Sequence, residues 1–312
     1  MQSIVTPEGQ IDDKKILRRE TIYKGMNGKL VERIYVTPYE TFIYKPLIGN
    51  AAPDREVWIY EHILPSFPPI YPKMIARSPD SSTGGGWALF EDLGRLGHVF
   101  DEAAAKALLS QAAAWHALPT EPYGRAQLRG QKPASEVVRA EMLQLRQERQ
   151  LLTADTPNMP DRLLNVFFSS LRQESLPADH VLSHGDLHLG NYALVDGQIK
   201  VLDWEDVHLN SRYWDLYYVI DLSHPLFPKA VQPAARERLL EHYMDEVARQ
   251  NGAGLKASFK RHYYLFSALY SLWMLKLIQS DIANNNGTWP LERLKLQLQE
   301  TTDSFIQCAE QL

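Results

Sequence analysis

Two hydrophobic patterns follow one another along the chain, and the change lies near residue 93. In the first part, β-branched and aromatic residues recur in the stretches 16–23, 30–36 and 41–44, with turn residues between them. This pattern predicts three consecutive antiparallel strands, and the first turn contains Gly25 and Gly28.

Three further segments complete the first part of the chain. Residues 55–64 have a helical pattern, residues 64–72 form a proline-rich connector into a strand, and a further strand is expected in residues 87–94. The glycines at 81–86 lack the Gly-Lys-Ser/Thr ending and the following helix of a phosphate loop. We therefore expect a flexible hairpin tip there.

Helical spacing dominates after residue 93. Asp101 is a candidate N-cap, because alanine, leucine and tryptophan then recur at helical spacing up to residue 117. Further helices are predicted at 135–152, 161–171, 233–250, 255–282 and 290–312.

The most informative polar residues lie at 183–191, Ser-His-Gly-Asp-Leu-His-Leu-Gly-Asn, and at 201–205, Val-Leu-Asp-Trp-Glu. Apolar runs flank both segments, and the Asp-Gly pair between them is a signal for a two-residue hairpin turn. Such a turn places the strand after Asn191 beside the strand before Asp203. We therefore expect Asp186, Asn191 and Asp203 to lie near one another.

These three side chains suit magnesium and a phosphate chain. Mg²⁺ takes oxygen ligands, often one or two carboxylates together with phosphate oxygens. The spacing Asp-x4-Asn, followed by Asp on the next strand, is that of the catalytic and magnesium loops of kinases. In that arrangement Asp186 takes the proton of the substrate hydroxyl, while Asn191 and Asp203 bind Mg²⁺.

The loop resembles that of the aminoglycoside phosphotransferase and choline kinase-like family, which carries His-Gly-Asp-x-His-x-Gly-Asn followed by Asp-Trp-Glu. Ala-Trp-His-Ala-Leu-Pro at 114–119 resembles a helix end of the same family, and Arg-Glu-x3-Tyr at 55–60 matches its helix start. The resemblance implies a protein-kinase-like α+β fold. It implies a small β-rich nucleotide-binding lobe at 1–93, a larger, mainly helical catalytic and substrate-binding lobe at 94–312, and ATP between the lobes.

The resemblance also implies transfer of the γ-phosphate of ATP to a small-molecule hydroxyl. Lys45 would pair with a glutamate of the next helix to position the α and β phosphates. Glu56 and Glu61 are both candidates, and they lie about 140° apart around a helix, so one of them faces the site. The family pattern favours Glu56.

Further nucleotide contacts follow from the same resemblance. Backbone N–H groups of Gly25 and Gly28 would cover the phosphates, although a plain hairpin turn also explains these glycines. The backbone near Glu91 would meet the adenine, and His188 is a candidate for a phosphate contact. Asp215 would accept hydrogen bonds from the catalytic-loop backbone; an N-cap also explains an aspartate there, and the two roles are compatible.

Two other functions fit parts of the sequence. His184 and His188 have the spacing of a metal-binding pair, so a metal-dependent hydrolase that uses them with Asp186 is one alternative. It would leave Asn191 without a role, and we expect His184 and His116 to be structural. The other alternative is a kinase-like structural or binding protein without turnover, such as a spore-coat relative.

Composition narrows the class of protein. The 312 residues are 45% hydrophobic and 23% charged, as in ordinary globular proteins, and the net charge of −5 argues against a general nucleic-acid binder. The single cysteine, Cys308, excludes an internal disulfide and fits a reducing cytoplasm. The start has no signal-peptide pattern, and the apolar run 263–278 is shorter than a bilayer span. We expect a cytoplasmic monomer or homodimer with no membrane or nucleic-acid partner.

The phosphate acceptor is less constrained. Glu205 and Asp206 in the loop, together with aromatic residues of the late helices, favour a cationic acceptor such as an amino sugar, choline or another amino-alcohol. An aromatic stripe at helical spacing is also typical of a core, which is the stronger interpretation. The aromatic residues concerned are Tyr217, Tyr218, Tyr263, Tyr264, Tyr270 and Trp273.

Overall fold

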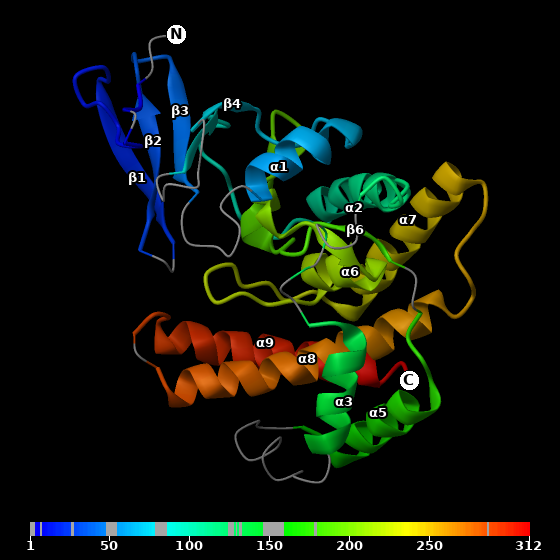
Figure 1. Cartoon of the computed structure of the whole chain (residues 1–312). Helices are drawn as coiled ribbons and strands as arrows, with labels where there is room; N and C mark the ends of the chain where they lie inside the picture. The colour runs from blue at the N-terminus through cyan, green and yellow to red at the C-terminus, as the bar shows by residue number, and fades with distance from the viewer. Residues whose placement is uncertain are drawn as a thin grey trace. The chain divides into compact units, whose positions relative to one another are not determined.

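The computed structural model describes residues 4–6, 8–25, 28–47, 55–78, 86–123, 128, 130, 133–145, 159–177, 180–285 and 287–312. The chain forms two compact units (Figure 1). The first comprises Met1–Gly97 with Leu194–Glu205, and the second comprises His98–Ala193 with Asp206–Leu312. The chain thus enters the first unit twice.

The first unit is built on a five-stranded antiparallel sheet of order β1-β2-β3-β5-β4. The three expected consecutive strands are present, and β5 and β4 extend the sheet beyond β3. The strands are β1 (Arg18–Lys24), β2 (Leu30–Tyr35), β3 (Thr41–Pro46), β4 (Met74–Arg77) and β5 (Trp87–Glu91). A helix, α1 (Arg55–His62), and a short 3-10 turn, η1 (Leu64–Ser66), lie between β3 and β4 in the sequence.

Side chains of β3 alternate between two hydrophobic clusters on opposite faces of the sheet, and Lys45 points to the face that α1 covers. Successive side chains of a strand point to opposite faces of the sheet. Phe42 and Tyr44 join the cluster that includes Ile34 and Trp87, whereas Ile43 packs on the opposite cluster, which includes Val57 of α1. Because Lys45 has the parity of Ile43, its side chain leaves the sheet on the α1 side.

The hairpin predicted from Asp196-Gly197 is confirmed. β7 (Tyr192–Val195) and β8 (Gln198–Val201) form a two-stranded sheet. Asp196 and Gly197 have φ angles of 50° and 75°. Positive φ at both central residues is what a type I′ turn requires, and aspartate and glycine adopt it most readily.

The second unit is mainly helical, and α8 and α9 lie side by side in it (Figure 1). α2 packs against both α6 and α7, and β6 pairs with β9 in a short antiparallel sheet. The helices are α2 (Glu102–His116), α3 (Ser135–Leu145), α5 (Asp161–Gln173), α6 (Arg212–Ile220), α7 (Pro233–Asn251), α8 (Phe259–Ala283) and α9 (Leu291–Ala309). The shorter elements are β6 (Val181–Ser183), η3 (Leu189–Asn191), η4 (Trp204–Asp206) and β9 (His208–Asn210).

Most helix boundaries agree with the sequence signals. The Asp101 carboxylate accepts a hydrogen bond from the N–H of Ala104, so the predicted N-cap is confirmed. Gly252 ends α7 with φ of 66°, the left-handed conformation of a glycine C-cap. The predicted helix at 135–152 extends to Leu145, and residues 146–152, like the expected hairpin tip at 81–85, lie outside the described residues.

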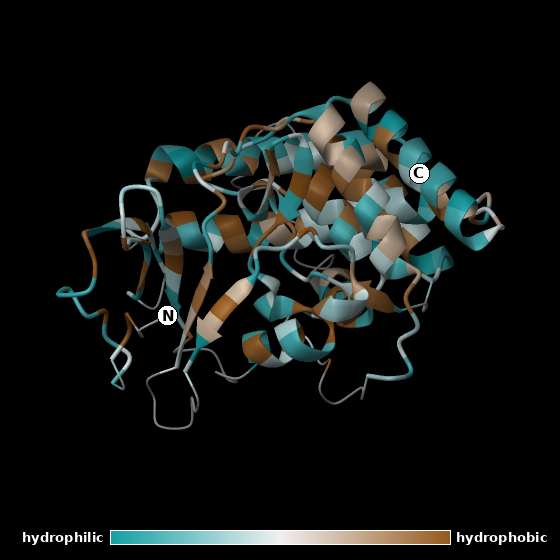
Figure 2. Ribbon diagram, turned by 90° about the horizontal axis from the view of Figure 1, so that it is seen from above, coloured by the Kyte–Doolittle hydropathy of each residue, from teal (hydrophilic) through white to brown (hydrophobic). Residues whose placement is uncertain are grey.

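The aromatic stripe of the late helices belongs largely to the core. The side chains of Tyr217, Tyr263 and Tyr270 are at most 1% exposed. Figure 2 shows the helical part of the chain with bands of hydrophobic residues between hydrophilic ones. Among the described residues, no helix has the length and apolarity needed to cross a membrane. Most residues of α8 between Tyr263 and Leu272 are buried in the core.

Candidate active site

Lys45 stands at the centre of a cluster of carboxylates in the first unit. Its Nζ lies 2.8 Å from Oε2 of Glu56, 2.6 Å from Oδ1 of Asp203 and 3.4 Å from Oε2 of Glu205. The predicted pairing of Lys45 with Glu56 is thus present. Glu61 instead pairs with Arg77 at 2.8 Å, on a more exposed part of α1.

Three contacts hold the Asp-Trp-Glu segment in place. Nε of Arg55 donates to the carbonyl oxygen of Glu205 at 3.0 Å. The fully buried Trp204 donates from Nε1 to the carbonyl of Val201, and its ring meets the edge of Phe67. Asp203 lies between these anchors with φ of 60°, in the left-handed region. The backbone at Asp203 is therefore set by its neighbours, which aims the carboxylate at Lys45.

The crowding of three carboxylates around one ammonium raises the pKa values of both Lys45 and Glu56. Burial and the nearby charges of Asp203 and Glu205 raise the pKa of Glu56 to about 7, against the opposing effect of Lys45. Burial alone would lower the pKa of Lys45, but the carboxylates, Asp203 foremost, raise it well above its usual value. Lys45 is thus held in its protonated form, and the carboxyl of Glu56 has a higher pKa than an exposed glutamate.

The same carboxylates form a donor set that suits a hard divalent cation. Oxygens of Glu56, Asp203 and Glu205 all lie within 4.8 Å of one another. Carboxylate oxygens are the ligands that Mg²⁺ takes in phosphate-transferring sites. The chemistry of this cluster therefore fits magnesium, although the ammonium of Lys45 already shares these oxygens.

The loop 183–191 of the second unit brings Asp186 and Asn191 together. Nδ2 of Asn191 donates to the carbonyl oxygen of Asp186 at 2.8 Å and to its Oδ2 at 3.3 Å. The N–H of Asp186 donates to Nδ1 of His184 at 3.2 Å. The gathering of Asp186 and Asn191 with Asp203 of the first unit stays a prediction.

Asp215 on α6 fastens this loop. Its buried carboxylate accepts hydrogen bonds from Oγ of Ser183 at 2.6 Å and from the N–H groups of His184 and Gly185 at 3.0 and 3.4 Å. Nε2 of His116 lies 3.1 Å away and provides another donor. Burial acts to raise the pKa of Asp215, but the hydrogen bonds, that of His116 foremost, outweigh it and lower the pKa to about 2.

These contacts decide three sequence-based expectations. Asp215 accepts from the loop backbone as predicted, and the N-cap role is wrong, because Ser211 is the N-cap of α6. His116 is buried between Tyr243 and Asp215, which confirms its packing role. His184 is fully buried, and its Nδ1 accepts from the loop backbone, as expected of a structural histidine.

Gly185 of the loop has no room for a side chain. Its φ is 88°, and an added Cβ would lie 2.3 Å from the carbonyl oxygen of Asp206. The carbonyl of Gly185 accepts a hydrogen bond from Nε1 of Trp214 at 2.8 Å. The glycine before Asp186 is therefore required by a close approach of two backbone segments.

His188 contacts its own loop. Nδ1 accepts from the N–H of Gly190 at 2.9 Å, and Nε2 lies 3.5 Å from Oδ2 of Asp186. The ring stacks on that of His224 with centroids 4.5 Å apart. The predicted contact of His188 with phosphate stays a prediction.

Comparison with known proteins identifies the family. A family model described as "Phosphotransferase enzyme family" matches residues 58–254, which is well over half of the chain. The chain belongs to the phosphotransferase enzyme family.

A curated relative of this phosphotransferase is Protein LicA of Haemophilus influenzae, which is 27% identical over 139 residues. That match covers 43% of this chain and 38% of LicA, so it spans well under half of either protein.

Solved structures match over nearly the whole phosphotransferase chain at low identity. The macrolide 2′-phosphotransferase MphH of Brachybacterium faecium is 16% identical, with a TM-score of 0.57 over 94% of this chain and 93% of that one. Aminoglycoside 2′-phosphotransferase-IIIa in its GDP complex is 15% identical, with a TM-score of 0.59 over 94% and 95%. A choline kinase from Cryptosporidium parvum is 12% identical, with a TM-score of 0.54 over 96% and 91%. The fold class is thus the predicted α+β, protein-kinase-like one.

Some of the backbone N–H groups that were predicted to contact nucleotide already donate hydrogen bonds within the protein. The N–H of Gly25 donates to the carbonyl of Lys29 and the N–H of Gly28 to that of Gly25, which favours a hairpin turn at these glycines. The N–H of Glu91 donates to the carbonyl of Lys73, so an adenine would have to meet other backbone groups nearby. All three contacts with nucleotide stay predictions.

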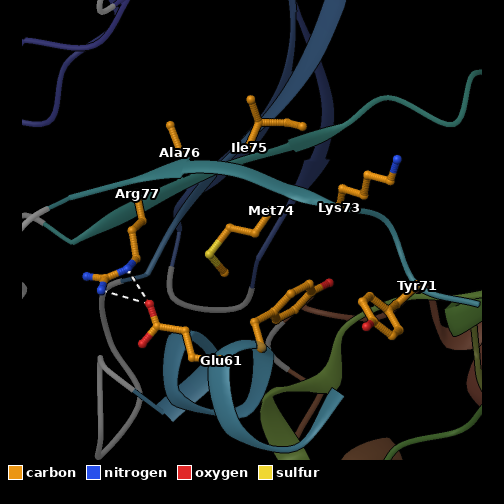
Figure 3. A pocket seen from close by; sticks show the side chains of 8 residues that line it. Glu61, Tyr71, Lys73, Met74, Ile75, Ala76 and Arg77 are labelled. Atoms are coloured by element: carbon orange, nitrogen blue, oxygen red, sulfur yellow. Dashed lines mark hydrogen bonds and ion pairs between the residues drawn. The ribbon is translucent and has the colours of Figure 1, made fainter. Parts of the chain in front are cut away.

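A cavity of about 440 Å³ lies between α1 and β4 of the first unit (Figure 3). Figure 3 shows the Arg77–Glu61 ion pair at one end and Tyr71 and Lys73 at the other. Of the residues considered for the site, the cavity is lined by Glu61, the candidate that does not pair with Lys45. Its lining residues are Tyr60, Glu61, Tyr71, Lys73, Met74, Ile75, Ala76 and Arg77.

Two parts of the site were missed from the sequence. Glu205 was associated with the acceptor, whereas in the structure it joins Lys45; its place in the Asp-Trp-Glu motif was the available signal. Arg55 was noted only as part of a motif, yet its side chain bonds the backbone of Glu205. A side chain's bond to a distant backbone carbonyl leaves no pattern in the sequence.

Proposed function

We propose that this phosphotransferase moves the γ-phosphate of ATP, with Mg²⁺, to a hydroxyl group of a small molecule. The observation that carries the proposal is the ammonium of Lys45 at ion-pair distance from both Glu56 and Asp203. In this assignment Lys45, oriented by Glu56, contacts the α and β phosphates. Asn191 and Asp203 are the magnesium ligands.

Asp186 is the proposed catalytic base. It accepts the proton of the acceptor hydroxyl, whose oxygen forms a bond to the γ-phosphorus while the bond from that phosphorus to the bridging oxygen of ADP breaks. Bound magnesium would neutralise charge on the phosphates. Asn191 holds the loop at Asp186 through hydrogen bonds to its backbone and carboxylate, so the base is positioned before substrate arrives.

The proposed acceptor is a cationic small molecule such as an amino sugar, choline or another amino-alcohol. The names of the similar structures include an aminoglycoside phosphotransferase and a choline kinase. In the second unit, Asp186 and Asp206 are close enough to Tyr218 to add to the effect of burial in raising its pKa. Two carboxylates near an aromatic ring attract a cation. A cytoplasmic location, and a monomer or homodimer, are part of the same proposal.

The test is calorimetric titration of ATP into the purified protein with and without Mg²⁺, for wild type and Asp203→Asn. We expect binding that depends on the metal in wild type and a loss of that dependence in the variant. Asp196→Asn is the matched control, because Asp196 also has a positive φ and lies in the hairpin just before Asp203. Equal affinity with and without Mg²⁺ would contradict the assignment of Asp203.

The two alternatives give different results. A kinase-like binding protein would bind nucleotide but release no ADP with any acceptor tried. A metal-dependent hydrolase using His184, Asp186 and His188 would contain a transition metal after purification, which elemental analysis detects.

A further inference from the structure

The imidazole of His188 has a fixed orientation in the second unit. Nδ1 accepts the N–H of Gly190, since a backbone N–H can only donate. In the neutral ring the proton must then be on Nε2. That nitrogen lies 3.5 Å from Oδ2 of Asp186. The protonated nitrogen of the ring is therefore the one that lies near the proposed base.

Oδ2 of Asp186 is thus faced from two directions. Nδ2 of Asn191 donates to it at 3.3 Å, and Nε2 of His188 approaches it from another residue of the same loop. A carboxylate that rotates freely has no preferred orientation, whereas two donors at one oxygen define its plane. The orientation of the Asp186 carboxylate is set by these neighbours.

Packing holds the His188 ring in place. It stacks on His224 at 14° between planes and on Phe227 at 20°, with centroids 4.5 and 5.6 Å apart. Burial lowers the pKa of His224 to about 4, so its ring is neutral at pH 7. An added Cβ at Gly190 would lie 2.3 Å from Phe227 and 2.7 Å from the His188 ring. Glycine at 190 is therefore required for the stack.

We propose that His188 is a positioning residue for Asp186, locked as the Nε2–H tautomer by the Gly190 N–H and by stacking on His224 and Phe227. The proposal rests on the proposed function, in which Asp186 is the base. It gives His188 a role in orienting the base, in place of the expected contact with phosphate. Because Gly190 has no side chain, the rings of His188 and Phe227 can stack beside it.

Two substitutions of His188 distinguish the roles of its two ring nitrogens. Asparagine at 188 places an acceptor near the position of Nδ1 but has no donor at Nε2, whereas glutamine extends a donor to Nε2 and gives up the Gly190 contact. For release of ADP from MgATP, with choline, an aminoglycoside or water as acceptor, we expect His188→Asn to lower kcat about tenfold or more, without changing the KM for ATP. His188→Gln should keep most of the wild-type kcat.

Other outcomes overturn the proposal. A several-fold rise in the KM for ATP in His188→Asn, with kcat kept, would mean that His188 contacts phosphate. Full activity in His188→Asn together with a defect in His188→Gln would mean that the ring only caps the loop.

A second measurement needs neither turnover nor a folded His188 variant. ¹⁵N NMR of histidine-labelled protein reports which ring nitrogen of His188 carries the proton. We expect Nε2 to carry it, and Asp186→Asn to shift that resonance more than any resonance of His224, while Asp196→Asn leaves both unchanged. A proton on Nδ1, or no response to Asp186→Asn, overturns the proposal. If wild type neither binds ATP nor releases ADP, the proposed function fails, and the NMR result alone decides the contact of His188 with Asp186.

Discussion

Replacing Asp215 by asparagine tests whether a buried carboxylate fastens the loop 183–191. The substitution keeps the shape of the side chain and removes its charge and one acceptor oxygen. In the native protein Oδ1 accepts from Ser183 and Gly185, and Oδ2 from His184, His116 and Trp115. The least costly orientation of the asparagine keeps its oxygen at the Oδ2 position. The N–H of Gly185 then faces an NH2 group that cannot accept its hydrogen bond.

The magnitude follows from the change in these hydrogen bonds. Bonds to a charged acceptor contribute about 1.5–3 kcal/mol and neutral ones about 0.5–1.5 kcal/mol, so three bonds at Oδ2 each weaken by about 1 kcal/mol. Lowering the pKa of Asp215 from 3.8 to about 2 corresponds to roughly 2–3 kcal/mol in favour of the ionised form. We therefore expect Asp215→Asn to lower the free energy of unfolding by about 3 kcal/mol.

The pH dependence gives an independent check of the sign. Because the pKa is lower in the folded protein, the stability from ionised Asp215 is fully present above the unfolded value of 3.8 and is lost as the pH falls toward about 2. Stability falls with decreasing pH in this window in wild type. In Asp215→Asn this contribution to the slope should disappear.

Urea denaturation followed by circular dichroism, at pH 7 and at several values between pH 5 and 3, measures both effects. Asp245→Asn is the matched control, since Asp245 is an exposed residue of the same unit. A loss under about 1 kcal/mol at pH 7, with the acid-side slope unchanged, would refute the view that the charge of Asp215 holds the loop.

Three further outcomes are expected. Glu56→Gln should lower kcat/KM for ADP release about tenfold or more, because Glu56 orients Lys45. Glu61→Gln, which alters the more exposed ion pair with Arg77, should change kcat/KM little. Steady-state assays of both variants compare the two ion pairs. Gly252→Ala should lower the free energy of unfolding by about 1 kcal/mol, because only the positive φ opposes a side chain there. Gly185→Ala should lower it by about 3 kcal/mol or more, because the added Cβ would also meet the backbone carbonyl of Asp206. Equal losses in urea titrations would contradict the close approach of Gly185 to Asp206. The Cys308 thiol, whose pKa burial and then the charge of Asp221 raise to about 12, should react with a thiol reagent only after unfolding, and rapid labelling of native protein would disprove its burial.

Local rules determined much of the fold. Strand alternation, the Asp196-Gly197 turn and the Asp101 cap depend on residues close in sequence, so their predictions were confirmed. The same holds for the helix stop at Gly252. Alternation along β3 also contained the information that Lys45 leaves the sheet on the α1 side.

The motif residues were predicted by type and spacing, but their partners were decided by tertiary structure. Lys45 and Asp203 are 158 residues apart, and the third carboxylate at Lys45, that of Glu205, followed from the conformation at Trp204 and Arg55. A hydrogen bond to a distant group depends on how whole elements pack, and the sequence carries no local pattern for it.

The histidines show the same division most clearly. The sequence determined that His188 stands two residues after Asp186. Only the folded chain decided that Nδ1 binds Gly190 and that Nε2 faces Asp186, because the ring of His224 and the missing side chain at 190 fix the imidazole plane. Residue identity sets which chemistry is available, and packing decides which atom of the side chain can use it.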